Sequence, residues 1–431
     1  MIEYHPYMDT QTKLNLLKKN YPEVNEEVLL ELLLSCRGSF KQTVLLLNEQ
    51  FDNEKASSVC HTPSYQSSLN DLWGSNKRQR IEGSGNVMLY TKESIETTIP
   101  YVSYHKSFLP AELADRVLKY LLDLDICTFN EFYIAGKKCI STHKTCLMTS
   151  EDFIRESKDN VNMNNFYIRG NPKKSIPYNS DLTVIQSLIQ DLVNETLAQR
   201  DLSKTPFHNR RPWNGGSLVC NRYDSIKSSL DWHSDRLTFM GPHPVIVSLS
   251  FGCTRYFRLR KIHPHKGSNL PPVYNIPVPH NTLLIMYGGC QEEYKHCVAP
   301  LPSIIDSLHP ISGETRINLT YRHYDSEWVS RIPRCPECNE PMTLRRMFKK
   351  IENRGKYYWS CSAQTSKNSE CKGFYWAKFD DYLEGKLKDY TLFSKDEDEC
   401  SQWIAEDDWE KLDYLKEYYK DLLLQRKKNP E

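Results

Sequence analysis

The sequence has no long apolar run and no dominant charge. No stretch of about 18 consecutive apolar residues occurs, which excludes a transmembrane helix. The 56 basic side chains nearly balance 55 acidic ones, so a uniformly basic nucleic-acid coat is excluded while local patches are not. Only 39% of the 431 residues are hydrophobic, and we expect several domains joined by segments that do not fold. Without a basic-then-apolar signal peptide, we expect an intracellular chain whose 14 cysteines are thiols or metal ligands.

His233 and Asp235 stand two residues apart in a stretch that we predict to be a β-strand. Side chains at positions i and i+2 of a strand point to the same side, so this pair can reach one metal ion. A third ligand must come from elsewhere, and His296 lies on a later strand-like run. Two histidines and one carboxylate form a facial triad with open positions, which suits non-haem Fe(II).

A second group of polar side chains recurs with period 2 on a later predicted strand. The group comprises Arg316, Asn318, Thr320 and Arg322. Apolar side chains occupy the opposite face of that strand. Two arginines that face a pocket need an anionic partner, and guanidinium groups match carboxylates well. A dicarboxylate such as 2-oxoglutarate satisfies both, and Asn221 and Tyr223 repeat the same spacing on another strand.

Taken in this order, the motifs of residues 100–325 resemble those of the AlkB family of 2-oxoglutarate- and Fe(II)-dependent dioxygenases. The resemblance rests on Asn221-Arg-Tyr223, His233-Ser-Asp235, Pro244–Gly252, His296 and Arg316–Arg322. It implies a double-stranded β-helix (jelly-roll) core and the oxidative demethylation of alkylated DNA or RNA bases. The implied iron ligands are His233, Asp235 and His296. The implied 2-oxoglutarate contacts are Asn221, Tyr223, Arg316, Asn318, Thr320 and Arg322.

The sequence departs from that family directly after the His-x-Asp motif. Close relatives that act on bases carry an acidic residue there, whereas this chain has Arg236 and Leu237. Neither side chain accepts a hydrogen bond from a base amino group, so a protein side-chain hydroxylase or demethylase is one alternative. A non-catalytic adaptor for ubiquitin and nucleic acid is another. Tyr167, Arg169 and Trp213 are candidates to line a base pocket, with core packing as the alternative.

Four cysteines near the C-terminus have the spacing of a zinc site. They are Cys335, Cys338, Cys361 and Cys371. Four thiolates suit tetrahedral structural Zn(II), and four free thiols are the alternative. The surrounding residues 334–379 are basic with interleaved aromatic residues and resemble a GRF-type zinc finger, which implies binding to single-stranded nucleic acid.

The N-terminal region is predicted to form three short helices. It resembles a CUE ubiquitin-binding domain, with Tyr21-Pro22 at that family's Phe-Pro position and Leu46-Leu47 at its di-leucine. These four residues are the candidate ubiquitin contacts, and a generic three-helix module is the alternative. Further on, Gln66–Trp73 fits a sliding-clamp-binding box, with an ordinary linker as the alternative. Lys77–Arg80 is either a nuclear address or solubilising charge.

We therefore predict a multidomain α+β protein that uses Fe(II), 2-oxoglutarate and Zn(II). Its expected location is the nucleus, with the cytoplasm as an additional location. The predicted parts are a CUE-like bundle at 8–52, a disordered linker at 53–96, the dioxygenase domain at 97–326, the zinc finger at 333–380, and an acidic tail at 381–431 with a helix over Trp409–Arg426.

Overall fold

The structure is a computed structural model of the whole chain. It describes residues 10–22, 24, 26–36, 40, 43–44, 47, 85–134, 137–158, 167–168, 171–172, 175–262, 271–301, 308–363, 370–385 and 390–428. The chain divides into two compact units. One contains Met1–Met88 with Pro272–Asn275, and the other contains Leu89–Pro271 with Ile276–Glu431. No helix within the described residues has the length and apolar character needed to cross a membrane.

The first unit contains helices α1 (Thr10–Asn20) and α2 (Glu26–Ser35), where two of the three helices were predicted. Their apolar side chains recur at helical spacing and pack into one small core. This core contains Leu14, Leu17, Tyr21, Val24, Val28, Leu29, Leu32, Leu33, Phe40 and Leu47. The third predicted helix falls mostly outside the described residues, so the three-helix bundle stays a prediction.

The predicted linker ends earlier than expected. Strand β1 (Asn86–Met88) pairs in parallel with β12 (Val273–Val278), and α5 (Lys92–Thr98) begins before residue 96. Thr91 caps α5 by accepting a hydrogen bond from the Ser94 backbone N–H, and Ser94 bonds back to the Thr91 backbone. A Ser at that position is a weaker capping signal than Glu or Gln, which is why the helix was missed. The clamp-like segment and the basic cluster lie outside the described residues.

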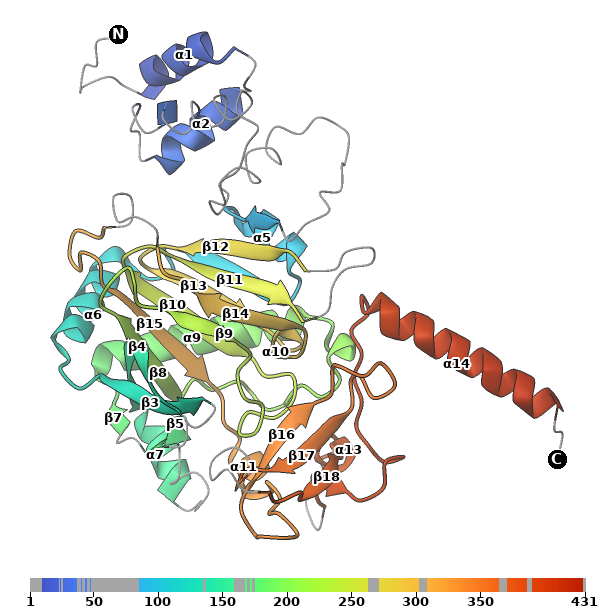
Figure 1. Ribbon diagram of the computed structural model, residues 1–431. Coiled ribbons are helices and arrows are strands. Elements are labelled where there is room, and N and C mark those ends of the chain that lie inside the picture. Colours follow the sequence, from blue (N-terminus) through green and yellow to red (C-terminus); the bar gives the residue numbers. More distant parts are fainter. Residues whose placement is uncertain are drawn as a thin grey trace. The chain divides into compact units, whose positions relative to one another are not determined.

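A large sheet of the second unit has the strand order β2-β13-β10-β15-β8-β4-β3, with β7 beside β4. Its strands are β2 (Val102–Lys106), β3 (Thr128–Ile134), β4 (Lys137–Thr149), β7 (Ser175–Pro177), β8 (Ser217–Tyr223), β10 (Ile246–Gly252), β13 (Thr282–Met286) and β15 (Arg316–Arg322). Every residue of β10 is buried, as expected for a central strand with both faces covered. Helices α6 (Ala111–Asp123) and α9 (Ser180–Gln199) supply apolar side chains to the core of this sheet (Figure 1).

A smaller sheet carries the order β1-β12-β11-β14-β9, where β11 is Arg255–Lys261, β14 is Tyr294–Val298 and β9 is Leu230–His233. The short helix α10 (Cys290–Glu293) leads directly into β14. The strands predicted to carry Asn221 with Tyr223 and Arg316 with Arg322 correspond to β8 and β15. These two sheets agree with the predicted jelly-roll core. The remaining elements are α7 (Glu151–Lys158), β5 (Tyr167–Ile168), β6 (Asn171–Pro172) and η1 (Leu202–Lys204).

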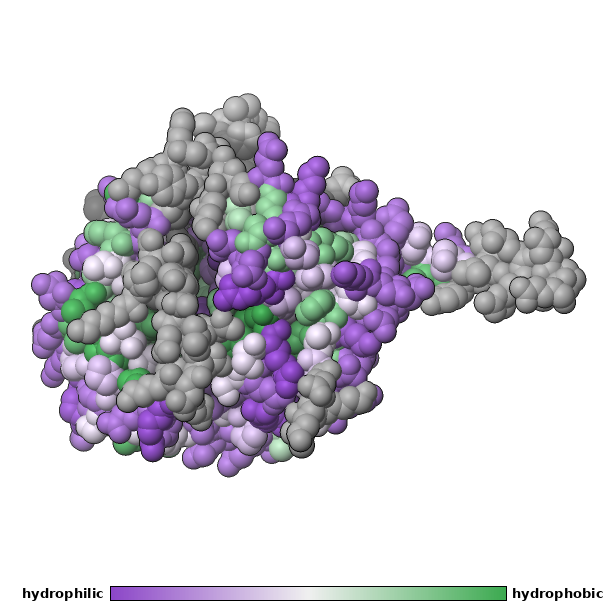
Figure 2. Space-filling model, turned by 90° about the horizontal axis from the view of Figure 1, so that it is seen from below, coloured by the Kyte–Doolittle hydropathy of each residue, from purple (hydrophilic) through white to green (hydrophobic). Residues whose placement is uncertain are grey.

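The cysteine-bearing region forms its own sheet in the order β16-β17-β18-β19, which is called the finger sheet below. These strands are β16 (Met342–Arg346), β17 (Tyr357–Cys361), β18 (Phe374–Ala377) and β19 (Phe393–Ser394). Short helices α11 (Ser326–Ser330) and α13 (Asp380–Leu383) flank it, and α14 (Trp409–Lys428) covers the helix predicted in the tail. One apolar core joins this sheet to the preceding domain, because Leu237 and Phe207 belong to the same cluster as Trp359. The surface drawn in Figure 2 is mostly hydrophilic, with small groups of hydrophobic residues.

Candidate metal centre and the groups around it

Three predicted metal ligands meet at the paired strands β9 and β14. His233 lies opposite His296 in the register of these strands, and their ring centroids are 4.2 Å apart. Asp235 follows β9, and its Oδ1 lies 3.7 Å from His233 Nε2. One ligand atom from each of the three residues lies within 4.8 Å of the other two. The structure therefore brings a facial triad together from positions far apart in the chain.

Hydrogen bonds orient the triad. His233 Nδ1 lies 2.7 Å from the Asp231 carbonyl oxygen, so Nδ1 carries the proton and the lone pair of Nε2 remains for a metal. The Asp235 backbone N–H donates to Gln291 Oε1 at 2.8 Å. Ser234 Oγ donates to the Tyr294 carbonyl at 2.8 Å. The last two bonds hold the segment after β9 against α10 and β14.

The protonation states suit a metal ion. Burial, reinforced by His233, lowers the pKa of His296 to about 3, so its imidazole is neutral. Burial opposes ionisation of Asp235, but Arg322, His296 and His233 together hold the pKa of this carboxyl below its usual range. His296 Nδ1 is also buried without a hydrogen-bond partner. Neutral imidazoles and an ionised carboxylate are the donor set that Fe(II) accepts.

Arg316 forms the centre of the second predicted group. It is 1% exposed, and its Nη2 donates to Ser250 Oγ at 2.8 Å and to Asn318 Oδ1 at 3.0 Å. Its Nε and Nη1 are buried without a hydrogen-bond partner. Burial lowers the pKa of Arg316 only to about 10, so the side chain is a cation at neutral pH. A buried cation with unmatched donors fits the distal carboxylate of a dicarboxylate.

The other members of this group follow from the pairing of β15 with β8. Arg316 lies opposite Tyr223, and Asn318 lies opposite Asn221. Thr320 Oγ1 accepts from Asn318 Nδ2 at 2.8 Å and from Asn221 Nδ2 at 3.3 Å. The Arg316 guanidinium lies 5.2 Å from the centroid of the Tyr223 ring. The predicted contacts thus form one continuous polar row.

Arg322 connects the two groups. Its Nε and Nη2 both donate to Asp235 Oδ2, at 3.1 and 2.8 Å. Because Oδ2 is held in this way, Oδ1 is the oxygen turned toward His233. Arg322 was predicted as a 2-oxoglutarate contact, and the structure shows in addition that it orients Asp235, a candidate iron ligand.

Comparison with known families decides the class of protein. Residues 101–322 match the model of the 2OG-Fe(II) oxygenase superfamily. The chain belongs to this superfamily. The predicted dioxygenase class is therefore confirmed, and the oxygenase has the residues to hold both Fe(II) and 2-oxoglutarate.

Two curated relatives match this oxygenase over part of its length. It is 44% identical over 110 residues to alpha-ketoglutarate-dependent dioxygenase alkB homolog 3 of Homo sapiens, covering 25% of this chain and 35% of that protein. It is 31% identical over 123 residues to DNA oxidative demethylase ALKBH2 of Arabidopsis thaliana, covering 25% of this chain and 37% of that protein. The chain thus spans about a third of the length of these relatives. A solved structure titled "The structure of OsALKBH1" is 17% identical with a TM-score of 0.33, over 52% of this chain and 97% of that one.

The sequence reasoning missed the junction between α10 and the finger sheet. Glu293 is 1% exposed, and Arg346 of β16 donates to its Oε1 at 3.0 Å. Arg346 also donates to the Glu292 carbonyl at 2.9 Å. Burial raises the pKa of Glu293 to about 7. No signal in the sequence indicates this junction, because two glutamates before a strand look like ordinary surface charge.

The departure after the His-x-Asp motif has a structural reason in this oxygenase. Leu237 is 6% exposed and packs into the core shared with the finger sheet. Thr238 accepts a hydrogen bond from Trp328 Nε1 at its carbonyl, 2.9 Å, and from the Leu344 N–H at its Oγ1, 3.2 Å. Arg236 is exposed. The segment after the iron ligand therefore anchors the finger sheet.

The four finger cysteines also converge. The sulfur atoms of Cys335 and Cys371 are 3.4 Å apart, as are those of Cys338 and Cys361, and all four lie within 4.8 Å of one another. A Cβ atom on Gly373 would stand 2.1 Å from Cys335 Sγ, so only glycine fits beside the cluster. Four thiolates at this spacing fit tetrahedral Zn(II).

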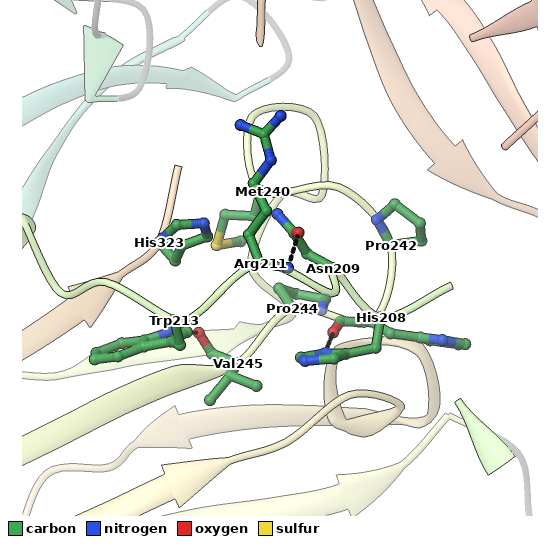
Figure 3. A pocket seen from close by; sticks show the side chains of 10 residues that line it. His208, Asn209, Arg211, Trp213, Met240, Pro242, Pro244, Val245 and His323 are labelled. Atoms are coloured by element: carbon green, nitrogen blue, oxygen red, sulfur yellow. Dashed lines mark hydrogen bonds between the residues drawn. The ribbon is translucent and has the colours of Figure 1, made fainter. Parts of the chain in front are cut away.

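The cavity in Figure 3 is separate from the predicted iron and 2-oxoglutarate residues. It encloses about 300 Å³, part of it open to solvent. It is lined by His208, Asn209, Arg211, Trp213, Met240, Pro242, His243, Pro244, Val245 and His323. None of the iron or 2-oxoglutarate residues borders it. Trp213 is 3% exposed and donates to the Val245 carbonyl, which fits the core-packing alternative; Arg169 and the side chain of Tyr167 lie outside the described residues.

The candidate ubiquitin contacts differ in their exposure to solvent. Tyr21 and Leu47 are 8% and 0% exposed and belong to the small core of the first unit. Pro22 is exposed, and Leu46 lies outside the described residues. Buried side chains hold a module together rather than meet a partner, so of the described candidates only Pro22 stays open for a contact.

Proposed function

We propose that this oxygenase oxidatively demethylates alkylated bases in single-stranded DNA or RNA. The observation that carries the proposal is the triad of His233, Asp235 and His296, which Arg322 links to strand β15. On the same strand, the two unmatched donors of Arg316 call for a carboxylate. The names of the relatives support the nucleic-acid substrate, since one is a DNA oxidative demethylase.

Each residue of the site has a task in this reaction. Bound Fe(II) with 2-oxoglutarate and dioxygen would supply the oxidation of an N-methyl group: one oxygen atom would enter succinate as carbon dioxide leaves, and the other would hydroxylate the methyl group, which would then leave as formaldehyde. Arg316 binds and orients the distal carboxylate of 2-oxoglutarate, and Arg322 fixes Asp235. The Phe257 ring stacks on His296 at a centroid distance of 5.2 Å and an interplanar angle of 25°. This buried apolar contact keeps water away from one side of the ligand.

The finger sheet offers a surface for unpaired bases. Tyr358 and Phe374 stack at 5.5 Å, and the Phe374 ring packs edge-on to Trp376 at 4.9 Å. Arg345 lies opposite Tyr358 on the neighbouring strand, and Lys356 Nζ is 5.6 Å from the Trp376 ring. Basic groups beside partly exposed rings bind phosphates and stack on bases without strict sequence preference. We infer that Zn(II) at the four cysteines holds these strands in place.

The protein-substrate alternative loses its main support. It rested on the missing acidic residue after the His-x-Asp motif, and Leu237 now has a packing role there. The segment after Asp235 anchors the finger sheet, so its sequence can differ from that of the relatives for a reason unrelated to the substrate. Nucleic acid is therefore the substrate that the site favours. Ubiquitin, a sliding clamp and the nuclear location stay predictions.

The test is an oxygenase assay on oligonucleotides that contain 1-methyladenine or 3-methylcytosine, with methylated peptides in parallel. We expect succinate and the unmethylated base to appear together on single strands, with no product from a His233→Ala variant. Succinate release driven by peptides alone would refute the nucleic-acid substrate. Absence of any 2-oxoglutarate turnover would refute the enzyme.

A further inference from the structure

Three cysteines outside the iron and finger sites stand in a row across neighbouring strands. The pairing of β4 with β8 places Cys146 opposite Cys220. Cys127 directly precedes β3, whose Thr128 lies opposite Thr145 of β4. Continuing that register by one residue brings Cys127 to Cys146, and their sulfur atoms are 3.0 Å apart.

The three sulfur atoms converge on one point. Each lies within 4.8 Å of the other two. Two strands separated by a third are roughly 9–10 Å apart, so Cys127 and Cys220 must both lean toward Cys146. The finger cysteines of the same chain have sulfur contacts of 3.4 and 3.5 Å. The trio is therefore packed as closely as a set of metal-binding thiols.

The surroundings of the trio disfavour charge. Cys146 and Cys220 are 4% and 1% exposed and belong to the apolar core that also contains Leu118 and Leu121. Cys127 is half-buried and gives access from the outside. Among the described residues, no carboxylate, histidine or fourth cysteine places a ligand atom with these three. A tetrahedral zinc site would therefore be incomplete, and three thiolates would leave uncompensated charge in an apolar interior.

We propose that Cys127, Cys146 and Cys220 form a binding site for trivalent arsenic. Arsenous acid, As(OH)₃, is uncharged and condenses with three neutral thiols. Three As–S bonds form, three As–O bonds break, and the three hydroxyl groups leave as water with the three thiol protons. No electron is transferred, and the bound product is neutral. Zn(II) or Cu(I) with three thiolates would instead place one or two negative charges in the core.

The site has a consequence for stability and for the neighbouring polar row. Occupancy links β3, β4 and β8 covalently through one atom, and a ligand that binds only the folded chain raises its resistance to unfolding. Asn221, a member of the proposed 2-oxoglutarate row, directly follows Cys220 on β8. Arsenic at Cys220 would therefore constrain the same strand that carries Asn221. The binding itself needs neither iron nor 2-oxoglutarate.

The test uses the full-length, reduced, zinc-loaded chain with sodium arsenite and native mass spectrometry. We expect the unaltered chain and a Cys139→Ser control, on the same strand as Cys146 but outside the trio, to gain one arsenic atom with zinc retained. Cys127→Ser and Cys220→Ala should each lose that tight equivalent. Cys127 is only half-buried, so its replacement disturbs the core less than replacement of Cys220. If the Cys220→Ala variant fails to fold, the Cys127→Ser variant alone tests whether the trio binds arsenic.

X-ray absorption at the arsenic edge provides the second readout. We expect three sulfur neighbours and no oxygen neighbour for the bound arsenic. Equal binding by the control and the two trio variants would overturn the proposal. So would arsenic uptake that releases zinc in proportion, because it would place the arsenic in the finger, or a retained oxygen neighbour.

Discussion

At the scale of the residue, the surroundings of Arg316 are the strongest indication of which ligand the site binds. It is a buried cation that has two nitrogen atoms without hydrogen-bond partners and that is bonded to neutral polar groups only. An isolated buried charge is costly, and an incoming carboxylate offsets that cost. The periodic pattern of polar residues predicted this group from the sequence. The pattern does not reveal that Arg322 is occupied by Asp235, because that contact depends on how two sheets meet.

Replacing Arg316 with methionine should separate binding from folding. Loss of charge-assisted hydrogen bonds worth about 1.5 kcal/mol or more should raise the KM for 2-oxoglutarate at least about tenfold. Stability should hold or increase, because the variant no longer buries an unmatched cation. Steady-state kinetics and urea unfolding measure the two effects. The exposed Arg210→Met serves as the matched control, and an unchanged KM for Arg316→Met would contradict the assignment.

His243 should make the protein sensitive to acid. It is 0% exposed, its ring stacks on Phe207, and burial lowers its pKa to about 3 from an ordinary value of 6.5. The unfolded chain therefore binds more protons than the folded chain between these values, and stability falls as the pH drops from 6.5 toward 3. His243→Asn removes this term, and asparagine tolerates the positive φ of 50° at this position. The denaturant midpoints of the unaltered chain and of His243→Asn should approach each other as the pH falls from 6.5 toward 3. If the two midpoints fall in parallel with pH, His243 is not the cause of the acid sensitivity.

At the scale of elements, α10 and the segment after β9 connect the candidate iron site to the finger sheet. Gln291 of α10 accepts a hydrogen bond from the backbone of Asp235, a candidate iron ligand, and Arg346 of the finger sheet donates to Glu293 of the same helix. Alternation of polar and apolar residues predicted β15, because the pattern repeats over seven residues. It missed α10, α5 and β1, because three to seven residues carry too little pattern and tertiary contacts stabilise such short elements.

Arg346→Ala should therefore weaken the iron site from a distance. Breaking a buried ion pair costs roughly 3–5 kcal/mol, and freeing α10 should loosen the hydrogen bond between Gln291 and Asp235. We expect lower affinity for Fe(II), measured by anaerobic titration on the folded fraction. The adjacent Arg345→Ala, on the opposite face of β16, should leave iron affinity unchanged and weaken binding to single strands. Equal iron affinity in both variants would contradict this coupling.

At the scale of the molecule, the oxygenase domain and the finger sheet lie in one compact unit and share an apolar core. The sequence predicted a domain boundary between residues 326 and 333, because nothing in the composition there indicates contact between the two parts. The structure instead gives a shared apolar core and further links from the tail, where Asp408 pairs with Arg354 at 2.9 Å and Asp407 pairs with Lys261. Cysteine spacing identified the four cysteines that converge in the structure, but a shared core arises from surfaces that only the fold brings together.

Removing zinc should consequently destabilise the whole second unit. A chelator that strips the four cysteines is expected to lower the unfolding temperature of the oxygenase and the finger together, in one calorimetric transition. Adding Zn(II) back should restore it. Two separate transitions, with the oxygenase one unaffected by the chelator, would show that the two parts fold independently.

The most direct test of the central claim is an anaerobic titration with Fe(II) and 2-oxoglutarate, followed by the visible absorption band of their chelate. We expect one equivalent of the chelate per chain, lost in His296→Ala and in Asp235→Ala, and reached only at much higher 2-oxoglutarate in Arg316→Met. A band of unchanged intensity in the His296 variant would show that these residues do not hold the metal.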